Sequence, residues 1–183
     1  MTVATKPEEM LEFWRAAGAK KWFAKNDAFD AACVARFRKL WEDGAAERLA
    51  HWEAQADSAL ALVLLLDQMP RNMFRGTPQV YASDPQARGV AARMIAKAFD
   101  RVVEKELRPF LYLPFSHSED LADHKRALEL YATLDDAEQM KWARHHHDIV
   151  ARFGRFPHRN AILGRASTPE EIIWLAQEDA FKG

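Results

Sequence analysis

Apolar residues recur every three or four positions through most of the chain, which is the spacing of one face of an α-helix. The pattern is clearest in the segment 29–41, where Phe29, Cys33, Phe37, Leu40 and Trp41 fall on one side. No stretch of useful length alternates apolar and polar residues as a strand would. The seven glycines and eight prolines lie between the helical stretches. The sequence therefore predicts an all-α fold.

Capping residues predict where the helices begin and end. Pro7 suits the first turn of a helix that stops at Gly18, and Asn26 or Asp27 caps the next one. Asp84 is expected to cap a helix that runs towards Leu107. Later helices are expected to start at Ser116 or Ser118, at 135–136 and at 167–171, with Gly154 ending the second of these three.

The segment 45–69 is apolar on nearly all sides around 60–66, as expected for a central helix covered by its neighbours. Pro70 is expected to disrupt that helix, because proline lacks the N–H that an inner helix position donates. The segment 110–115 is short, apolar and bounded by prolines. It is interpreted as a buried connector.

Composition narrows the class of protein. The chain has 183 residues, of which 49% are apolar and 29% charged, and its net charge is −1. These values predict one globular domain spanning 1–183 and argue against a disordered chain and against nucleic acid as a partner. The longest apolar run, 59–66, is too short to cross a membrane. Cys33 is the only cysteine, which excludes an internal disulfide and favours the cytoplasm.

The connector 67–78 is the first of three segments that combine polar recognition groups with apolar flanks. No acidic residue occurs from Gln68 to Ser83, while Arg71 and Arg75 lie four positions apart and flank Asn72. On a helical turn the two arginines would project together and could clamp an anion. The alternative is structural, with the arginines neutralising Asp67 or capping the end of a helix.

The second connector, 113–120, places His117 and Ser118 just before an expected helix start. Backbone N–H groups at such a start can hold an oxyanion or a phosphate. The alternative is that the serines cap the helix and that His117 satisfies a buried carbonyl group.

The third connector, 152–165, has the densest positive charge in the chain. It contains four arginines and His158, and no acid occurs between Ile149 and Pro169. Arg155 and Arg159 could point into a cleft while the neighbouring phenylalanines anchor the turn, with Asn160 beside them.

Three successive histidines, His145, His146 and His147, raise the question of a metal site. Successive helix positions point about 100° apart, so these rings cannot bind one ion together. Only His147 is expected on the apolar stripe, and Asp148 is expected to pair with arginines one turn away. No His-x-x-x-His pair on one helix, second carboxylate–histidine cluster, cofactor fingerprint or nucleophile motif is present, and no cofactor is predicted.

The three connectors resemble the signature blocks of a bacterial family, the domain-of-unknown-function family numbered 924. The likeness extends from about Trp14 to the segment 167–171, with Met69 where the family is expected to have phenylalanine. The resemblance implies a tetratricopeptide-like stack of antiparallel helices. It implies no function and carries over no site residue.

The leading hypothesis is that the three connectors converge on a pocket for a small anionic ligand bearing a carboxylate or phosphate. In this hypothesis the arginines and Ser118 bind the ligand, two asparagines orient it and two histidines transfer protons. The binding residues are Arg71, Asn72, Arg75, Ser118, Arg155, Arg159 and Asn160, and the proton-transfer residues are His117 and His158. The alternatives are a groove for a peptide or protein partner and, third, a metal-dependent hydrolase. Catalysis and assembly into a homo-oligomer are left open.

Overall fold

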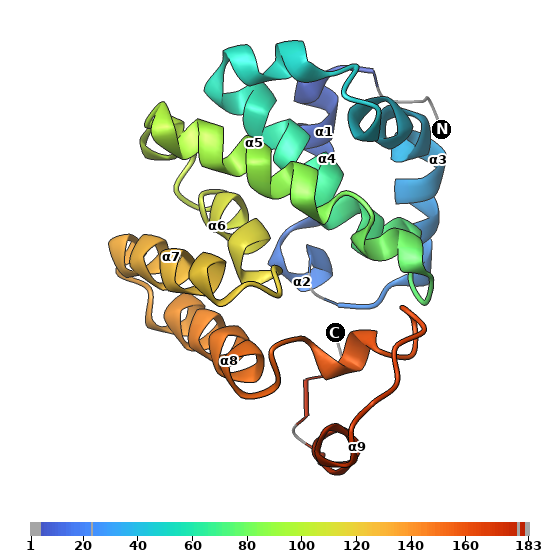
Figure 1. The fold of residues 1–183 in the computed structure, drawn as a ribbon. Coiled ribbons are helices and arrows are strands. Elements are labelled where there is room, and N and C mark those ends of the chain that lie inside the picture. Colours follow the sequence, from blue (N-terminus) through green and yellow to red (C-terminus); the bar gives the residue numbers. More distant parts are fainter. Residues whose placement is uncertain (1–4, 23, 179, 182–183) are drawn as a thin grey trace. The chain divides into compact units, whose positions relative to one another are not determined.

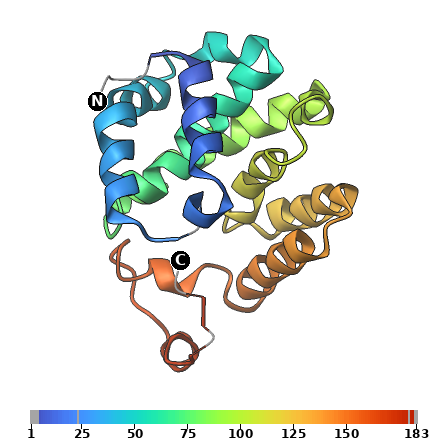
Figure 2. The same ribbon diagram turned by 180° about the vertical axis from the view of Figure 1, so that it is seen from behind.

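The computed structural model describes residues 5–22, 24–178 and 180–181 (Figures 1 and 2). All regular elements in these residues are helices, as predicted. The chain comprises two compact units, Met1–Pro114 and Phe115–Gly183. The expectation of a single domain over 1–183 and that of a tetratricopeptide-like stack stay predictions.

Unit 1 is built around a central helix. Its elements are α1 (Pro7–Ala17), α2 (Ala19–Trp22), α3 (Asp27–Ala45), η1 (Ala50–Ala54), α4 (Ala56–Met73), η2 (Pro78–Tyr81), α5 (Asp84–Ala96), η3 (Phe99–Arg101) and most of α6 (Pro109–Ser116). Helices α1, α3 and α5 pack against α4 (Figure 1). Every residue from Ala59 to Pro70 is buried, which explains why this stretch is apolar on nearly all sides.

Local signals place the first helices as predicted. Helix α1 begins at Pro7 and ends at Gly18, and the Asn26 side chain accepts a hydrogen bond from the Phe29 N–H at the start of α3. Cys33 is fully buried in the α3 face, and burial raises the pKa of its thiol to about 12. A thiol that stays protonated is a poor nucleophile, so Cys33 serves as a residue of the hydrophobic core.

The prediction that Pro70 ends the central helix is wrong, because α4 continues to Met73. Proline cannot donate to the Leu66 carbonyl one turn earlier. The Ser83 hydroxyl donates to that oxygen instead, over 2.6 Å, and itself accepts from the Trp41 indole N–H. A buried chain of hydrogen bonds thus replaces the missing bond and keeps the helix intact.

Three further predictions in unit 1 differ from the structure. The central helix, expected from 45, begins at Ala56, because α3 extends to Ala45 and η1 intervenes. Helix α5 ends at Ala96 and not near Leu107, and its N-cap is Ser83, so Asp84 is its first residue. The segment 110–115 is buried except for the half-buried Leu113, as expected, but it is helical, as α6.

Unit 2 contains α7 (Leu121–Tyr131), η4 (Ala132–Leu134), α8 (Ala137–Phe153), η5 (Pro157–Arg159) and α9 (Pro169–Leu175). The predicted caps at Asp136, Gly154 and 167–171 are confirmed, and the cap of α7 is Asp120, two residues after Ser118. The core of this unit includes Ile149, Val150, Phe156 and Trp174.

Helix α8 differs from the prediction in which of its side chains it buries. His146 is buried and His147 only half-buried, because the helix turns Ala143, His146, Ile149 and Val150 inward. Trp142 is 46% exposed. Asp148 hydrogen-bonds His147, and Arg152 pairs with Glu170, so the predicted ladder between Asp148 and the arginines does not form.

Candidate functional site

The first connector forms a buried ion-pair network. Both terminal nitrogens of Arg71 donate to the Asp84 carboxylate, over 2.9 and 3.0 Å, and Nη1 also donates to the Asp67 carbonyl. The Asp67 side chain is fully buried, and one of its oxygens lies 3.5 Å from Arg71 Nη1. Burial opposes the charge on Arg71, but the two aspartates outweigh it and raise its pKa.

Arg75 and Asn72 meet in the same network. Arg75 Nε donates to Asp30 over 2.6 Å, and its Nη2 donates to the Asn72 side-chain oxygen over 3.0 Å. Asn72 in turn donates to the Gln68 carbonyl. The contacts match the structural alternative for this connector, since an added anion would have to displace a carboxylate from each arginine.

In unit 2, Arg155 and Asn160 share one partner, the buried carboxylate of Glu171. Arg155 donates to its two oxygens over 2.7 and 2.8 Å, and Asn160 donates to one of them over 3.2 Å. The hydrogen bonds from Arg155 contribute most to lowering the pKa of Glu171, which falls to about 2. Glu171 also completes the capping box of α9 with Thr168, so this cluster fastens the third connector to α9.

The second and third connectors are joined by a further arginine, Arg165, which the sequence did not single out. It binds Glu119 through two hydrogen bonds of 2.6 and 2.9 Å, while Glu119 accepts a third from the Phe156 N–H. Burial opposes ionisation of Glu119, but Arg165 and this N–H outweigh it and lower its pKa. Glu119 therefore neutralises Arg165, as Glu171 neutralises Arg155 in the same connector.

Arg159 and Ser118 make mainly backbone contacts. Arg159 Nη2 donates to the His117 carbonyl over 2.9 Å, and its guanidinium lies over the Phe156 ring. The Ser118 hydroxyl accepts from the Asp120 N–H, but Asp120 and not Ser118 caps α7, so the capping expected of this serine is wrong.

The two predicted proton-transfer histidines pack in an aromatic cluster of unit 2. The His117 ring centroid lies 6.2 Å from that of His146, and His158 lies 5.0 Å from Phe181. Phe181 in turn lies 4.8 Å from His146. Burial lowers the pKa of His146 to about 3, so it stays neutral. Within the described ranges, no group of three histidine, cysteine or acidic side chains is placed to hold a metal ion.

Convergence of the three connectors stays a prediction. Arg71, Asn72 and Arg75 belong to unit 1, and the remaining predicted residues belong to unit 2. Within each unit carboxylates bind part of the predicted set, namely Arg71, Arg75, Arg155 and Asn160. Arg159, Ser118 and the two histidines make backbone or ring contacts instead.

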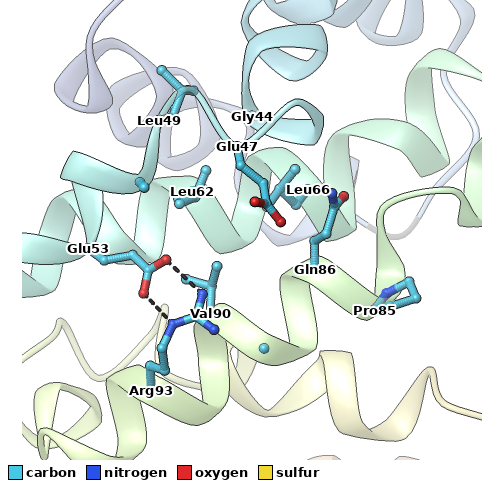
Figure 3. A pocket seen from close by; sticks show the side chains of 12 residues that line it. Gly44, Glu47, Leu49, Glu53, Leu62, Leu66, Pro85, Gln86, Val90 and Arg93 are labelled. Carbon is cyan, nitrogen blue, oxygen red and sulfur yellow. Dashed lines mark hydrogen bonds and ion pairs between the residues drawn. The ribbon is translucent and has the colours of Figure 1, made fainter.

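A different feature, a groove of about 450 Å³ in unit 1, has the dimensions of a ligand site (Figure 3). It lies between the end of α3 with η1 on one side and α5 on the other, over α4. Its apolar lining comprises Gly44, Leu49, Ala50, Leu62, Leu66, Pro85, Gly89 and Val90. Its polar lining comprises Glu47, Glu53, Gln86 and Arg93.

Glu47 stands in the turn that ends α3, in a conformation that favours glycine. The Glu47 N–H donates to the Gly44 carbonyl and the Arg48 N–H to the Asp43 carbonyl, the two bonds of a Schellman motif. Glu47 has φ +59°, a left-handed conformation that costs an L-residue about 1–2 kcal/mol. Its carboxylate points into the groove and forms no hydrogen bond or ion pair with any described residue (Figure 3).

Gln86 and Arg93 are held in place by neighbours. Gln86 Nε2 donates to the Ala45 carbonyl at the end of α3, over 2.8 Å, which leaves its side-chain oxygen available. Arg93 donates through Nε and Nη2 to the two oxygens of Glu53, over 2.6 and 2.7 Å (Figure 3). Two fixed polar groups therefore stand at the edge of an apolar floor.

Sequence reasoning missed the groove. Glu47, Gln86 and Arg93 look like ordinary surface positions in a helical chain. One available signal was Gly89 in the middle of a helix, since glycine costs about 1 kcal/mol there relative to alanine. Such a glycine indicates a close approach of some other group.

Fold and site together define an all-helical protein in which arginine–carboxylate networks fasten the connectors and a half-open groove lies beside the central helix. The chain belongs to the bacterial family of unknown function DUF924, whose family model matches residues 10–179. It is similar to a solved protein of unknown function from Agrobacterium tumefaciens, with 48% identity and a TM-score of 0.90. The likeness covers 93% of this chain and 96% of that one. No curated protein matches the sequence. In the part of the chain that the structure describes, no helix is long and apolar enough to cross a membrane.

Proposed function

We propose that this protein is a binding protein for a small amphipathic cation, and that the groove of unit 1 is its site. The observation that carries the proposal is the Glu47 carboxylate, which faces an apolar floor without a partner among the described residues. A carboxylate beside low-dielectric surface attracts a cation more strongly than one in open water.

The floor defines the rest of the ligand. Leu62, Leu66 and Val90 are each less than 5% exposed and form a fixed floor, while Ala50 and Pro85 of the same lining are exposed and offer apolar surface that a branched aliphatic body would cover. Burial of apolar area contributes about 25 cal/mol per Å². The ligand's ammonium group would meet the Glu47 carboxylate and the side-chain oxygen of Gln86.

The test is a thermal-shift comparison of 3-methylbutylamine with 3-methylbutanol, which has the same body without the charge. A ligand that binds only the folded state raises the melting temperature. We expect stabilisation by the amine, a much smaller effect of the alcohol, and loss of the difference in Glu47→Gln. Glu12→Gln, which removes the same charge from the exposed face of α1, is the matched control and should behave like the parent.

Equal shifts with the amine and the alcohol, or an undiminished amine shift in Glu47→Gln, would overturn the proposal. The anion hypothesis is tested in the same assay with phosphate, dicarboxylates and acidic peptides on the parent and Arg155→Ala. Stabilisation by an anion that Arg155→Ala abolishes would move the binding function to the connectors.

A further inference from the structure

Arg93 has hydrogen-bonding capacity that its partner does not use. A guanidinium carries five N–H groups, and the bidentate pair with Glu53 occupies one on Nε and one on Nη2. The two N–H groups of Nη1 and the second of Nη2 donate to no acceptor in the described ranges. Glu53 therefore fixes the orientation of the guanidinium and leaves one edge of it open.

Gly89 provides access to that edge. A Cβ placed on Gly89 would come within 3.3 Å of Arg93 Nη1 and would meet no other atom within 4 Å. Nη1 thus lies over bare backbone one turn earlier on α5, with open space beside it. Both residues line the groove, so a ligand on its floor can reach Nη1 across Gly89.

The charged groups of Glu47 and Arg93 line the same groove. The pKa of Arg93 is raised, first by its hydrogen bonds to Glu53 and then also by the charges of Glu53 and Glu47. Lys97 adds a second positive group at this end, where its ammonium donates to the Glu53 carbonyl over 3.1 Å. A cation site and an anion site therefore stand near each other above one apolar floor.

We infer that the ligand is a small zwitterion with an aliphatic side chain, of the α-amino acid class. Its ammonium group binds Glu47 and Gln86, its carboxylate binds Nη1 of Arg93, and its side chain lies on Leu62, Leu66 and Val90. Charge-assisted hydrogen bonds at both ends fix the orientation of the zwitterion in the groove, whereas a simple amphipathic cation is held at one end only. The inference rests on the proposed function and adds a second recognised group to it.

The experiment is a calorimetric titration with three probes that share one aliphatic body. They are L-leucine, 3-methylbutylamine, which lacks the carboxylate, and 4-methylpentanoate, which lacks the ammonium group. We expect leucine to bind the parent about tenfold more tightly than the amine, equivalent to about 1.4 kcal/mol. Arg93→Gln should weaken the binding of leucine and should not weaken that of the amine, because it removes the partner of the leucine carboxylate and frees the Glu53 carboxylate in the same groove.

Two further variants exclude a merely structural effect. Arg15→Gln breaks an exposed pair with Glu104 of the same type, away from the groove, and should keep the preference for leucine. Gly89→Ala places a methyl group against Nη1 of Arg93, on a helix that tolerates alanine. It should weaken the binding of leucine more than the binding of the amine.

The outcomes separate this inference from the proposed function. If leucine and the amine bind equally, and Arg93→Gln changes neither, the zwitterion assignment is overturned even when Glu47→Gln weakens both. If Glu47→Gln weakens neither, the proposed function fails as well. Binding of 4-methylpentanoate as tight as that of leucine would contradict recognition of both charges.

Discussion

The first connector and the groove lie in the same unit, and they differ in how far their charged groups are already paired. In the connector, Arg71 and Arg75 are each held by aspartates, and Asn72 bonds to the backbone and to Arg75. In the groove, Glu47 has no partner among the described residues, and Arg93 uses only one edge of its guanidinium. A run of recognition residues in the sequence therefore marks a structural network here. In our proposal, the ligand binds in the groove because charged groups there keep N–H groups and carboxylate oxygens that no described residue uses.

Removal of Arg71 should have the largest effect on stability. In Arg71→Met the buried Asp67 and Asp84 lose the guanidinium that both contact, and we expect the free energy of unfolding to fall by about 3–5 kcal/mol. Urea denaturation measures it. Arg15→Met, at an exposed ion pair, should cost less than about 1 kcal/mol. Equal losses in the two variants would contradict a structural role for the connector.

Acidification should lower the stability of unit 2, because its buried histidines resist protonation. Burial lowers the pKa of His124 and takes that of His146 from 6.5 to about 3, so the folded chain resists protonation that the unfolded chain accepts. Stability is complete above pH 6.5 and is lost as pH falls towards 3. For His146 alone the loss is about 1.4 kcal/mol per pH unit.

The check is urea denaturation of the parent and His146→Phe at a series of pH values. The phenylalanine keeps an aromatic ring in the cluster and cannot be protonated, so the dependence on pH should become shallower. His51→Phe replaces an exposed histidine of unit 1 and should leave the dependence of stability on pH unchanged. A slope that His146→Phe does not alter would show that protonation acts elsewhere.

Replacement of Glu47 by glycine should have the smallest effect on stability and the opposite sign. Glu47→Gly relieves the left-handed strain in the Schellman turn, and we expect a gain of about 1 kcal/mol together with loss of amine binding. Asp135→Gly removes the same charge at a similar φ of +52° in unit 2, outside the groove lining, and should gain stability with binding retained. A Glu47→Gly variant that still binds the amine would exclude Glu47 from recognition.

The sequence predicted the features that depend on neighbouring residues. The caps at Asn26, Asp136 and Thr168 and the stop at Gly154 are local, and each is confirmed. The continuation of α4 through Pro70 was not predictable in this way, because the hydroxyl that replaces the missing bond comes from Ser83, 17 positions further along the chain.

The candidate site was not predictable for a related reason. Asp67, four positions from Arg71, was open to prediction, but the acids that bind Arg71 and Arg155 through two hydrogen bonds each lie 13 and 16 positions away, outside the runs that looked purely basic. The groove residues come from the end of α3, from η1 and from α5, and only packing of these elements over α4 brings them together. These contacts between elements distant in the sequence decide whether a charged side chain keeps hydrogen-bonding groups without a partner.

The most direct test of the central claim is to locate the bound amine by amide chemical-shift mapping during titration with 3-methylbutylamine. Gly44 and Gly89 line the groove, and their amides report on it. The account predicts saturable shifts centred on Gly44, Gly89 and Val90 in the parent, and none there in Glu47→Gln. Shifts centred on the connector around Arg155 and Arg159, or shifts scattered without saturation, would contradict it.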